Sequence, residues 1–478
     1  MSVVQDVPGL ILQLLSDVYE VVSQSEDMLD LEQGVHRLVN QTARELLEKV
    51  LQERDEELAE GRDKKALRMV GKRTRTLVTP VGEVHLKRAY CRDVKTGRGV
   101  FLLDGSLGLS PHQRLSPWLE QLVVRTVVDL PYHRAQKLLC EVIPGLPLVS
   151  TMAAWAAVQR EGSMMVQKAD ERRQQLFAWG ELPAGRRQTE QLGLEADEVL
   201  VRSRQRPKGK IGLKVAAAYE GKEATGVGRR RLVERQVTVM VGDSETFWEH
   251  TVTEAGRKWD LSSIQCTTVG GDGASWVKQG LEHFPGSVYR LDPYHLRRAL
   301  VEALGRGHAV YPEVCAGIAT GDWARVEAAL QGALQQGKKE KRDDIRRLGG
   351  YLRNNWEGIV ESQEAQNLGA IEGQVFHHVA RRMKRHGARW SGAGANHLAW
   401  LLAARANDEL FHDRAKPTEA CPGIRSTLIG RASSARKTLG SDPREWLAAS
   451  LPALTGPHGD RPWVKWCLRQ LGRTPKLA

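Results

Sequence analysis

The sequence lacks the features that mark secreted, zinc-binding or membrane-spanning proteins. Its 478 residues include six cysteines, which are scattered, with no CxxC pair and no tight Cys/His cluster. A disulfide framework and a zinc ribbon are therefore not indicated. The amino terminus lacks a basic segment ahead of its apolar stretch, and no run of about 18 apolar residues occurs anywhere. We therefore expect no export, no membrane span and a reduced cytoplasmic protein.

Positive charge is what the sequence has in excess. It holds 70 Lys and Arg against 58 Asp and Glu, a net charge of +12. This balance favours a polyanionic partner, nucleic acid before membrane. With 41% apolar and 27% charged residues, the chain can bury a sizeable core and is expected to form two to four globular units.

Three regions are expected before the central domain. Residues 1–70 alternate apolar and charged positions at helical spacing, which predicts an N-terminal helical region. Residues 71–105 alternate with period two around a Pro-Val-Gly turn and predict a small β-hairpin unit with basic tips. Residues 106–165 have the outline of a DNA-binding helix-turn-helix, in which Ser150 caps the second helix. A plain helical hairpin is the alternative for that region.

The region 185–295 has the pattern of an α/β domain. Three β-rich runs are followed by a helical stretch, a fourth strand and then a fifth: "QLGLEADEVLVRS" (191–203), "KIGLKVAAAYEG" (210–221), "RRLVERQVTVMVGD" (230–243), "SETFWEHTVTEAGRKW" (244–259), "SSIQCTTVGGDG" (262–273) and "SVYRLDPYHL" (287–296). This order predicts the first part of an RNase H-like core. A charged helical insertion (296–365), a helix carrying Glu372 (366–405) and a basic C-terminal tail (406–478) complete the predicted organisation.

Two acids lie on strands of this predicted core. Asp272 follows the fourth strand between two glycines, and Asp197 lies inside the first strand on the face of Val199 and Val201. An unpaired charge there would cost several kcal/mol, which a bound cation would offset. Mg²⁺, with Mn²⁺ as a substitute, is a hard ion that prefers carboxylate oxygens. Glu195 and Glu198 compete with Asp197 for this role, and an acid that meets only water or an arginine is the structural alternative.

Glu372 is the third candidate ligand. Positions 372, 375, 376, 379 and 383 form one stripe of a helix, which places the glutamate on an otherwise apolar face. Basic residues off this stripe and near the first strand are expected to meet DNA phosphates, although a solvated face is the alternative. These residues are Arg381, Arg382, Lys384, Arg385, Arg389, Lys208 and Lys210.

Several fragments together resemble one family. In order along residues 70–405 they are "GEVHLKRAY", "LLDGSLGLSPHQRLSP", "EADEVLVRS", "GGDGASWVKQGLEHFP", "YRLDPYHLRRAL", "LRNNWEGI" and "GAIEGQVFHHVARRMKRHGARW". In this combination the chain resembles the Lre-type insertion-sequence transposases, bacterial DDE enzymes that are distantly similar to the Mutator type. One departure is Ala370-Ile371, which stands where that family usually has a Cys-Ser pair.

The resemblance implies an enzyme with a defined site. Asp197, Asp272 and Glu372 would be the catalytic acids and would hold two Mg²⁺ ions, and Asp292 with His295 matches an acid-x-x-His element found near such sites. The enzyme would bind double-stranded DNA at terminal inverted repeats, cleave it and join the 3′ ends to target DNA, as a homodimer or higher oligomer at the nucleoid. A domesticated DNA-binding regulator and an RNase H-like nuclease without strand transfer are the alternatives.

Overall fold

The computed structural model describes residues 3–411, apart from positions 144–145, 147–148, 182, 184, 206–207, 228, 337–338, 361–367 and 386. The expected basic tail therefore lies outside the described residues from position 412 onward. The chain divides into two compact units, one containing residues 1–122 and 136–153 and the other residues 123–135 and 154–411. Within the described ranges, no helix has both the length and the apolar character needed to cross a membrane.

The first unit begins with two long helices, α1 (Val3–Gln24) and α2 (Met28–Glu60). The Asp27 side chain caps α2 by accepting a hydrogen bond from the Asp30 amide, the usual role of Asp at this position. An antiparallel sheet follows in the order β1 (Leu67–Thr79), β2 (Gly82–Asp93), β3 (Gly99–Phe101). Gly82 has φ 122°, which allows the tight turn between β1 and β2. The short helix α3 (Leu102–Ser106) completes this part.

Three helices follow, α4 (Pro117–Asp129), α5 (Tyr132–Val142) and α6 (Thr151–Phe177). The Ser150 hydroxyl accepts a hydrogen bond from the Ala153 amide at 3.1 Å, so it caps α6 as the sequence predicts. Helix α6 has 27 residues and buries one side over much of its length. DNA binding by α5 and α6, which correspond to the two helices of the expected helix-turn-helix, stays a prediction.

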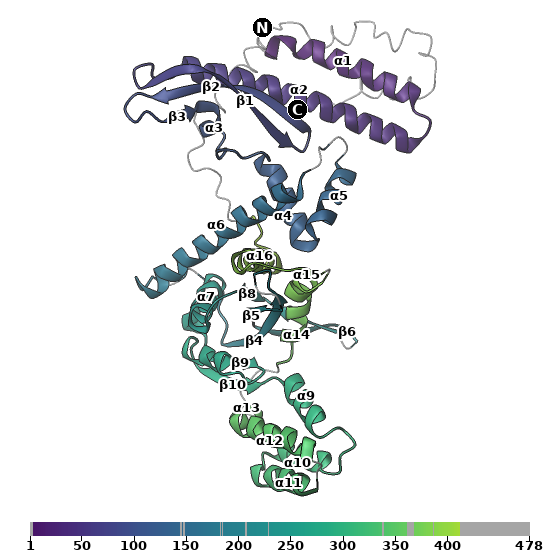
Figure 1. Ribbon diagram of the computed structural model, residues 1–478, viewed down its shortest axis with the longest axis vertical. Coiled ribbons are helices and arrows are strands. Elements are labelled where there is room, and N and C mark those ends of the chain that lie inside the picture. Colours follow the sequence, from purple (N-terminus) through teal and green to yellow (C-terminus); the bar gives the residue numbers. More distant parts are fainter. Residues whose placement is uncertain are drawn as a thin grey trace, which may run out of the picture. The chain divides into compact units, whose positions relative to one another are not determined.

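A five-stranded mixed sheet forms the centre of the second unit, so the predicted α/β class is correct (Figure 1). Its strands run in the order β10 (Ser287–Leu291), β9 (Cys266–Gly271), β4 (Gln191–Arg202), β5 (Lys210–Tyr219), β8 (Gln236–Met240). Strands β4, β5 and β8 are antiparallel neighbours, whereas β9 is parallel to both β4 and β10.

The predicted third strand, residues 230–243, is two separate strands. Strand β7 (Arg229–Val233) pairs with β6 (Gly221–Gly226) in a two-stranded ribbon, and only β8 joins the main sheet. Every residue of β8 is buried, whereas the three arginines of β7 are exposed. Guanidinium groups cannot be buried unpaired, so the chain leaves the sheet there, and Glu234 at φ 50° makes the break.

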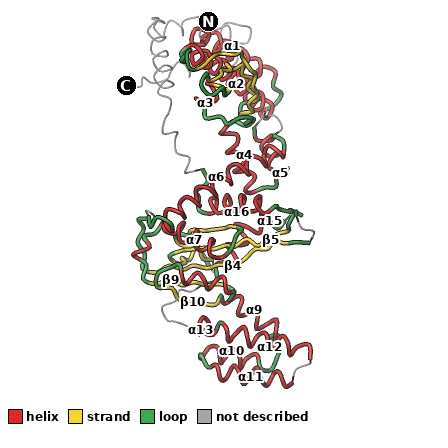
Figure 2. Tube along the Cα trace, turned by 60° about the vertical axis from the view of Figure 1, so that its left-hand side comes forward, coloured by secondary structure: helices red, strands yellow, loops and turns green. Residues whose placement is uncertain are grey.

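Helices pack on the central sheet (Figure 2). Helix α7 (Ser244–Lys258) and helix α16 (Gly392–Ala406) contribute Phe247, Trp248 and Trp400 to a core that includes Leu194 of β4 and Val269 of β9. This packing fixes the strands that carry the acidic residues.

A second helical group, seen at the bottom of Figure 1, has its own core. Its members are α9 (Pro293–Ala303), α10 (Tyr311–Thr320), α11 (Trp323–Gln336), α12 (Lys339–Asn354) and α13 (Trp356–Ile359). It corresponds to the expected helical insertion and begins at Pro293. The chain then returns through α14 (Ile371–Gln374), a π-helical segment η3 (Val375–Ala380) and α15 (Arg381–Met383).

Candidate metal centre

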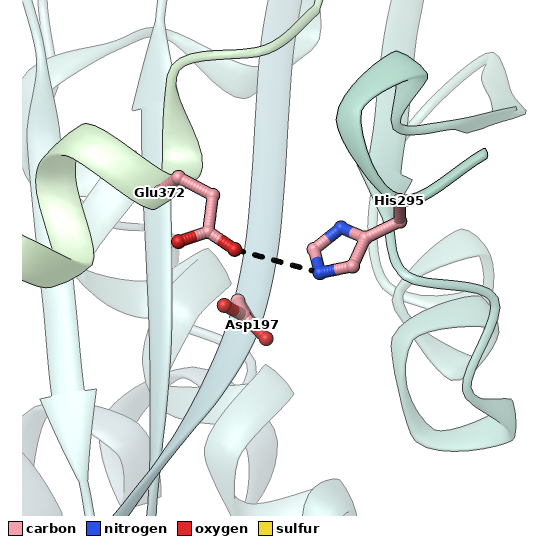
Figure 3. Close-up of side chains that lie close together, drawn as sticks. All are labelled: Asp197, His295 and Glu372. Carbon is pink, nitrogen blue, oxygen red and sulfur yellow. Dashed lines mark ion pairs between the residues drawn. The ribbon is translucent and has the colours of Figure 1, made fainter. Parts of the chain in front are cut away.

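Three side chains from three different elements converge beside the central sheet. Asp197 of β4, His295 of α9 and Glu372 of α14 each place one potential ligand atom within 4.8 Å of the others (Figure 3). His295 Nε2 lies 3.5 Å from Glu372 Oε1. The cluster combines two carboxylates with one imidazole, a set of donors that can hold a divalent cation.

The register of the parallel strands explains why acids meet here. Glu195 of β4 pairs with Gly270 of β9, and Leu291 of β10 pairs with Gly271 of β9. Asp197, Asp272 and Asp292 lie one or two residues further along β4, β9 and β10, so they come side by side where β9 and β10 end. The Asp292 amide also donates to the Gly271 carbonyl at 2.9 Å, which ties two of these strand ends together.

Asp197 has an environment that disfavours its charge. The pKa of its carboxyl is raised to about 6, mainly by burial and to a smaller extent by the nearby negative charges of Glu372 and Asp272. A hydrogen bond from the Glu198 amide at 2.7 Å and the charge of His295 act in the opposite direction. A carboxylate destabilised in this way would gain free energy from a neighbouring cation.

Asp272 occupies a turn that two glycines make possible. A Cβ on Gly271 would lie 2.6 Å from the Ala196 carbonyl oxygen, and Gly273 has φ 96° and packs against Asn355. The Asp272 carboxylate accepts a hydrogen bond from the Ala274 amide at 2.9 Å. Its charge raises the pKa of Asp197 and of His295, so it lies close to both, although it is not one of the three clustered ligands.

His295 is held by Asp292, the acid of the predicted acid-x-x-His element. Its Nδ1 lies 2.8 Å from Asp292 Oδ2, and the Asp292 side chain is 1% exposed. This hydrogen bond is the main reason why the pKa of His295 is raised. The buried Asp292 therefore favours an imidazolium whose Nε2 points towards Glu372.

Glu372 lies at the edge of the apolar face of its helical segment, not within it. Its side chain is 46% exposed, and Phe376, expected on the buried stripe, is 44% exposed. Glu372 lies in the first turn of α14, ahead of the π-helical segment, whereas Phe376 lies within that segment, whose wider turn holds one extra residue. Val379 and Met383 remain buried, whereas Phe376 turns outward.

Glu195, the rival to Asp197, has a different task. Its buried carboxylate accepts hydrogen bonds from the amides of residues 369, 370 and 371 at 2.8 to 3.2 Å and from the Tyr219 hydroxyl. Lys222 Nζ lies 3.7 Å from the same carboxylate. Glu195 is thus satisfied by the protein itself, and it ties β4 to the start of the segment that carries Glu372.

Of the basic residues expected to contact DNA, Arg382 is a wrong prediction. It is 7% exposed, its Nε donates to the Val127 carbonyl at 2.8 Å, and its guanidinium lies 5.4 Å from the Trp390 ring. This hydrogen bond and the neighbouring rings of Tyr132 and Trp390 accommodate the guanidinium in the interior. The other expected positions are exposed, namely Arg381, Lys384, Arg385, Arg389, Lys208 and Lys210. Their contact with DNA stays a prediction.

Sequence reasoning placed His295 near the three acids, where the structure has it, but did not assign Glu195 its role. The Asp-Pro-Tyr-His spacing after a strand was a signal for the position of His295, because a residue in the first turn of the helix that follows reaches the same strand edge. No sequence signal was available for the role of Glu195. The amides that Glu195 binds are 174 or more positions away along the chain.

The comparisons with known proteins identify a family. Residues 23–415 match the model described as "Uncharacterised protein family (UPF0236)". A UPF0236 protein of Caldanaerobacter subterraneus subsp. tengcongensis, whose name joins eleven labels from TTE0033 to TTE2212, is 22% identical over 85% of this chain and 83% of its own length.

Two further relatives carry the same family name. UPF0236 protein TTE2489 of the same organism is 23% identical over 81% of this chain and 80% of its own. The "UPF0236 protein in vanSb 3'region" of Streptococcus gallolyticus is 23% identical over 85% of this chain and 89% of its own. These findings correct the resemblance to Lre-type insertion-sequence transposases, because neither the matching model nor these relatives carry that name. The chain belongs to the UPF0236 family.

Proposed function

We propose that this protein is a metal-dependent DDE transposase that binds the terminal inverted repeats of its own mobile element, cleaves DNA phosphodiester bonds and transfers the 3′ ends to target DNA. The observation that carries the proposal is the meeting of Asp197 with Glu372, beside the strand end that bears Asp272. These acids come from positions 175 residues apart in the chain. Binding DNA alone would not require them to meet.

The sheet supports an RNase H-like assignment of the domain. Its first three strands in the main sheet, β4, β5 and β8, are sequential antiparallel neighbours, and β9 and β10 then add parallel to the other side of β4. Asp197 lies on the central strand, and Asp272 follows the adjacent one. This arrangement is the expected one for a nuclease or transposase that uses acids from the first and fourth strands.

The donor set supports Mg²⁺, with Mn²⁺ as a substitute. Asp197 and Glu372 offer carboxylate oxygens close together, and the raised pKa of Asp197 indicates negative charge that the protein leaves uncompensated. Asp197, Asp272 and Glu372 would hold the ions. When bound, two such ions activate a water or hydroxyl nucleophile and stabilise the leaving oxygen of a phosphodiester.

The protein's own residues would prepare this site. Glu195 holds the backbone at 369–371 and so positions Glu372 relative to Asp197. Asp292 orients His295 and keeps a proton on the imidazole, whose Nε2 is the atom that faces Glu372. We propose that His295 exchanges this proton with water or with a reacting oxygen beside the two carboxylates.

Two further observations support a mobile-element enzyme. A hollow of about 1080 Å³ beside α14 is lined by five Lys and Arg, Arg230 among them, against the acids Glu223, Glu234 and Asp408, and this positive balance suits a phosphate backbone. The name of one relative joins eleven labels of a single series in one organism. Repeated genes in one genome are what a mobile element leaves behind. On its DNA ends the enzyme is proposed to act as a homodimer or higher oligomer.

The test is cleavage of a plasmid that carries the gene with its flanking DNA. Wild-type protein should cut at the element ends when Mg²⁺ or Mn²⁺ is present, and Asp272→Asn should cut at least about 100-fold more slowly while still shifting the DNA in a gel. Protein that binds the ends but never cuts them would favour a regulator. Cutting without joined products would favour a nuclease, and undiminished cutting by Asp272→Asn would remove that residue from the site.

A further inference from the structure

Positive charge is concentrated in one segment of the first unit, residues 62–114. Residues 62–114 contain 13 Lys and Arg against four Asp and Glu, a net charge of +9, compared with +12 for all 478 residues. The preceding helix α2 has the opposite balance, with nine acids against four Lys and Arg. A strongly basic segment therefore follows directly on an acidic helix.

The acids of α2 pair with this segment only in part: Glu56 lies 3.1 Å from Lys72, and two other acids accept hydrogen bonds from backbone amides. Glu48 accepts a hydrogen bond from the His85 amide at 2.7 Å, and Asp55 accepts one from the Ala89 amide at 2.7 Å. These contacts close the edge of β2 where β3 does not pair with it. These two carboxylates are therefore not paired with the arginine side chains of β1 and β2.

A groove of about 930 Å³ collects these arginines. It is lined by parts of β1, β2 and β3 and by residues 109–114. In its floor, Arg75 and Arg88 both bind the Asp104 carboxylate, Arg75 at 2.7 Å. Arg75 also donates to the carbonyls of Ser110 and Gln113, which fixes the loop that forms one wall. Two guanidinium groups against one carboxylate leave the floor positive.

The rim of the groove adds charge that no carboxylate balances. Arg73 and Arg114 are exposed, and among the described residues neither has an acidic side chain within ion-pair distance. Arg73 lies 5.9 Å from the centre of the Tyr90 ring, which holds it over the groove. Arg73 of β1 lies directly opposite Arg88 of β2 in the sheet. Like charges directly opposite one another destabilise a sheet unless an anion lies between or beside them.

We propose that this groove, formed by β1, β2, β3 and residues 109–114, binds the sugar-phosphate backbone of duplex DNA. Guanidinium groups match phosphate oxygens in geometry, and the exposed guanidinium of Arg73, which lies beside the Tyr90 ring, loses little freedom on binding. The choice of DNA over another polyanion rests on the proposed function. The groove would anchor DNA through a surface that is separate in sequence from Asp197, Asp272 and Glu372.

The test compares two double variants of the full chain that lose the same charge. Arg73→Ala with Arg114→Ala alters the rim, and Arg346→Ala with Arg347→Ala removes two exposed arginines of α12 that pair with Asp343 and Asp344. Binding of a fluorescent mixed-sequence 30-base-pair duplex is measured between 50 and 300 mM salt without divalent cations. Both rim residues are exposed, and matching circular dichroism spectra would verify folding.

Loss of two phosphate contacts should reduce the slope of log affinity against log salt by about 1.8 and weaken binding near 0.1 M salt on the order of 50-fold. The control pair should leave the slope unchanged, and Arg73→Lys should retain most of the slope. An unchanged slope in the rim variant would overturn the proposal, as would polyglutamate that competes as strongly as DNA. Because no divalent cation is present, these outcomes are independent of cleavage. If DNA binding depends on the rim arginines but the protein never cuts DNA, the groove proposal stands and the transposase proposal fails. If the protein cuts DNA but binding does not depend on the rim arginines, the groove proposal fails and the transposase proposal stands.

Discussion

Replacing Glu195 by glutamine should loosen the segment that carries Glu372. The carboxylate accepts bonds from three backbone amides and the Tyr219 hydroxyl, and Lys222 lies 3.7 Å away. Glutamine keeps one acceptor oxygen but turns an NH₂ group towards donors. Hydrogen bonds to a charged group contribute roughly 1.5 to 3 kcal/mol each, and breaking a buried ion pair costs about 3 to 5 kcal/mol.

We therefore expect Glu195→Gln to lower the free energy of local opening around residues 369–371 by about 3 kcal/mol. Hydrogen–deuterium exchange of a peptide that covers these residues should then become on the order of 100-fold faster. Glu198→Gln is the matched control, because Glu198 is exposed on the same strand. Its effect should stay within about 0.5 kcal/mol. Exchange in Glu195→Gln that equals that of the control would refute the positioning role.

Three further substitutions test other parts of the second unit. Arg382→Ala should lower the free energy of unfolding by about 2 to 4 kcal/mol in urea titrations, because a buried guanidinium and its packing are lost, whereas exposed Arg381→Ala should change it by less than about 0.5 kcal/mol. Gly273→Ala should cost about 1 to 2 kcal/mol, because its φ of 96° and the nearby Asn355 both disfavour a Cβ, and wild-type stability would show that the turn relaxes freely. Arg381→Ala with Arg385→Ala should reduce the slope of log affinity against log salt by the loss of up to about two phosphate contacts. An unchanged slope would favour the alternative that these residues only face solvent.

Local patterns predicted the central domain well. The stretches expected to form the first, second and fourth strands contain β4, β5 and β9, and α7 begins at the predicted residue 244. These elements have strong β alternation or a clear N-cap, so the signal lies within a few residues. The third strand was misjudged because alternation alone does not tell whether a strand joins the main sheet or a separate ribbon.

The site was less predictable, because it depends on contacts between distant positions. The approach of Asp197, inside β4, to Asp272, at the end of β9, could be inferred, since the two acids were expected on strands of one sheet. The π-helical segment could not be inferred, and Phe376 within it is exposed while Arg382 just after it is buried. The capture of the residue 369–371 amides by Glu195 also depends on tertiary structure that no local pattern encodes.

Anomalous scattering from a crystal of the full chain grown with Mn²⁺ is the most direct test of the central claim. We predict an anomalous difference peak bounded by the carboxylates of Asp197 and Glu372, with Asp272 turned towards it, and metal–oxygen distances near roughly 2.2 Å. The peak should disappear in Asp197→Asn crystals grown in the same way. No peak between these side chains at saturating Mn²⁺, or an equal peak in the Asp197→Asn protein, would contradict the account.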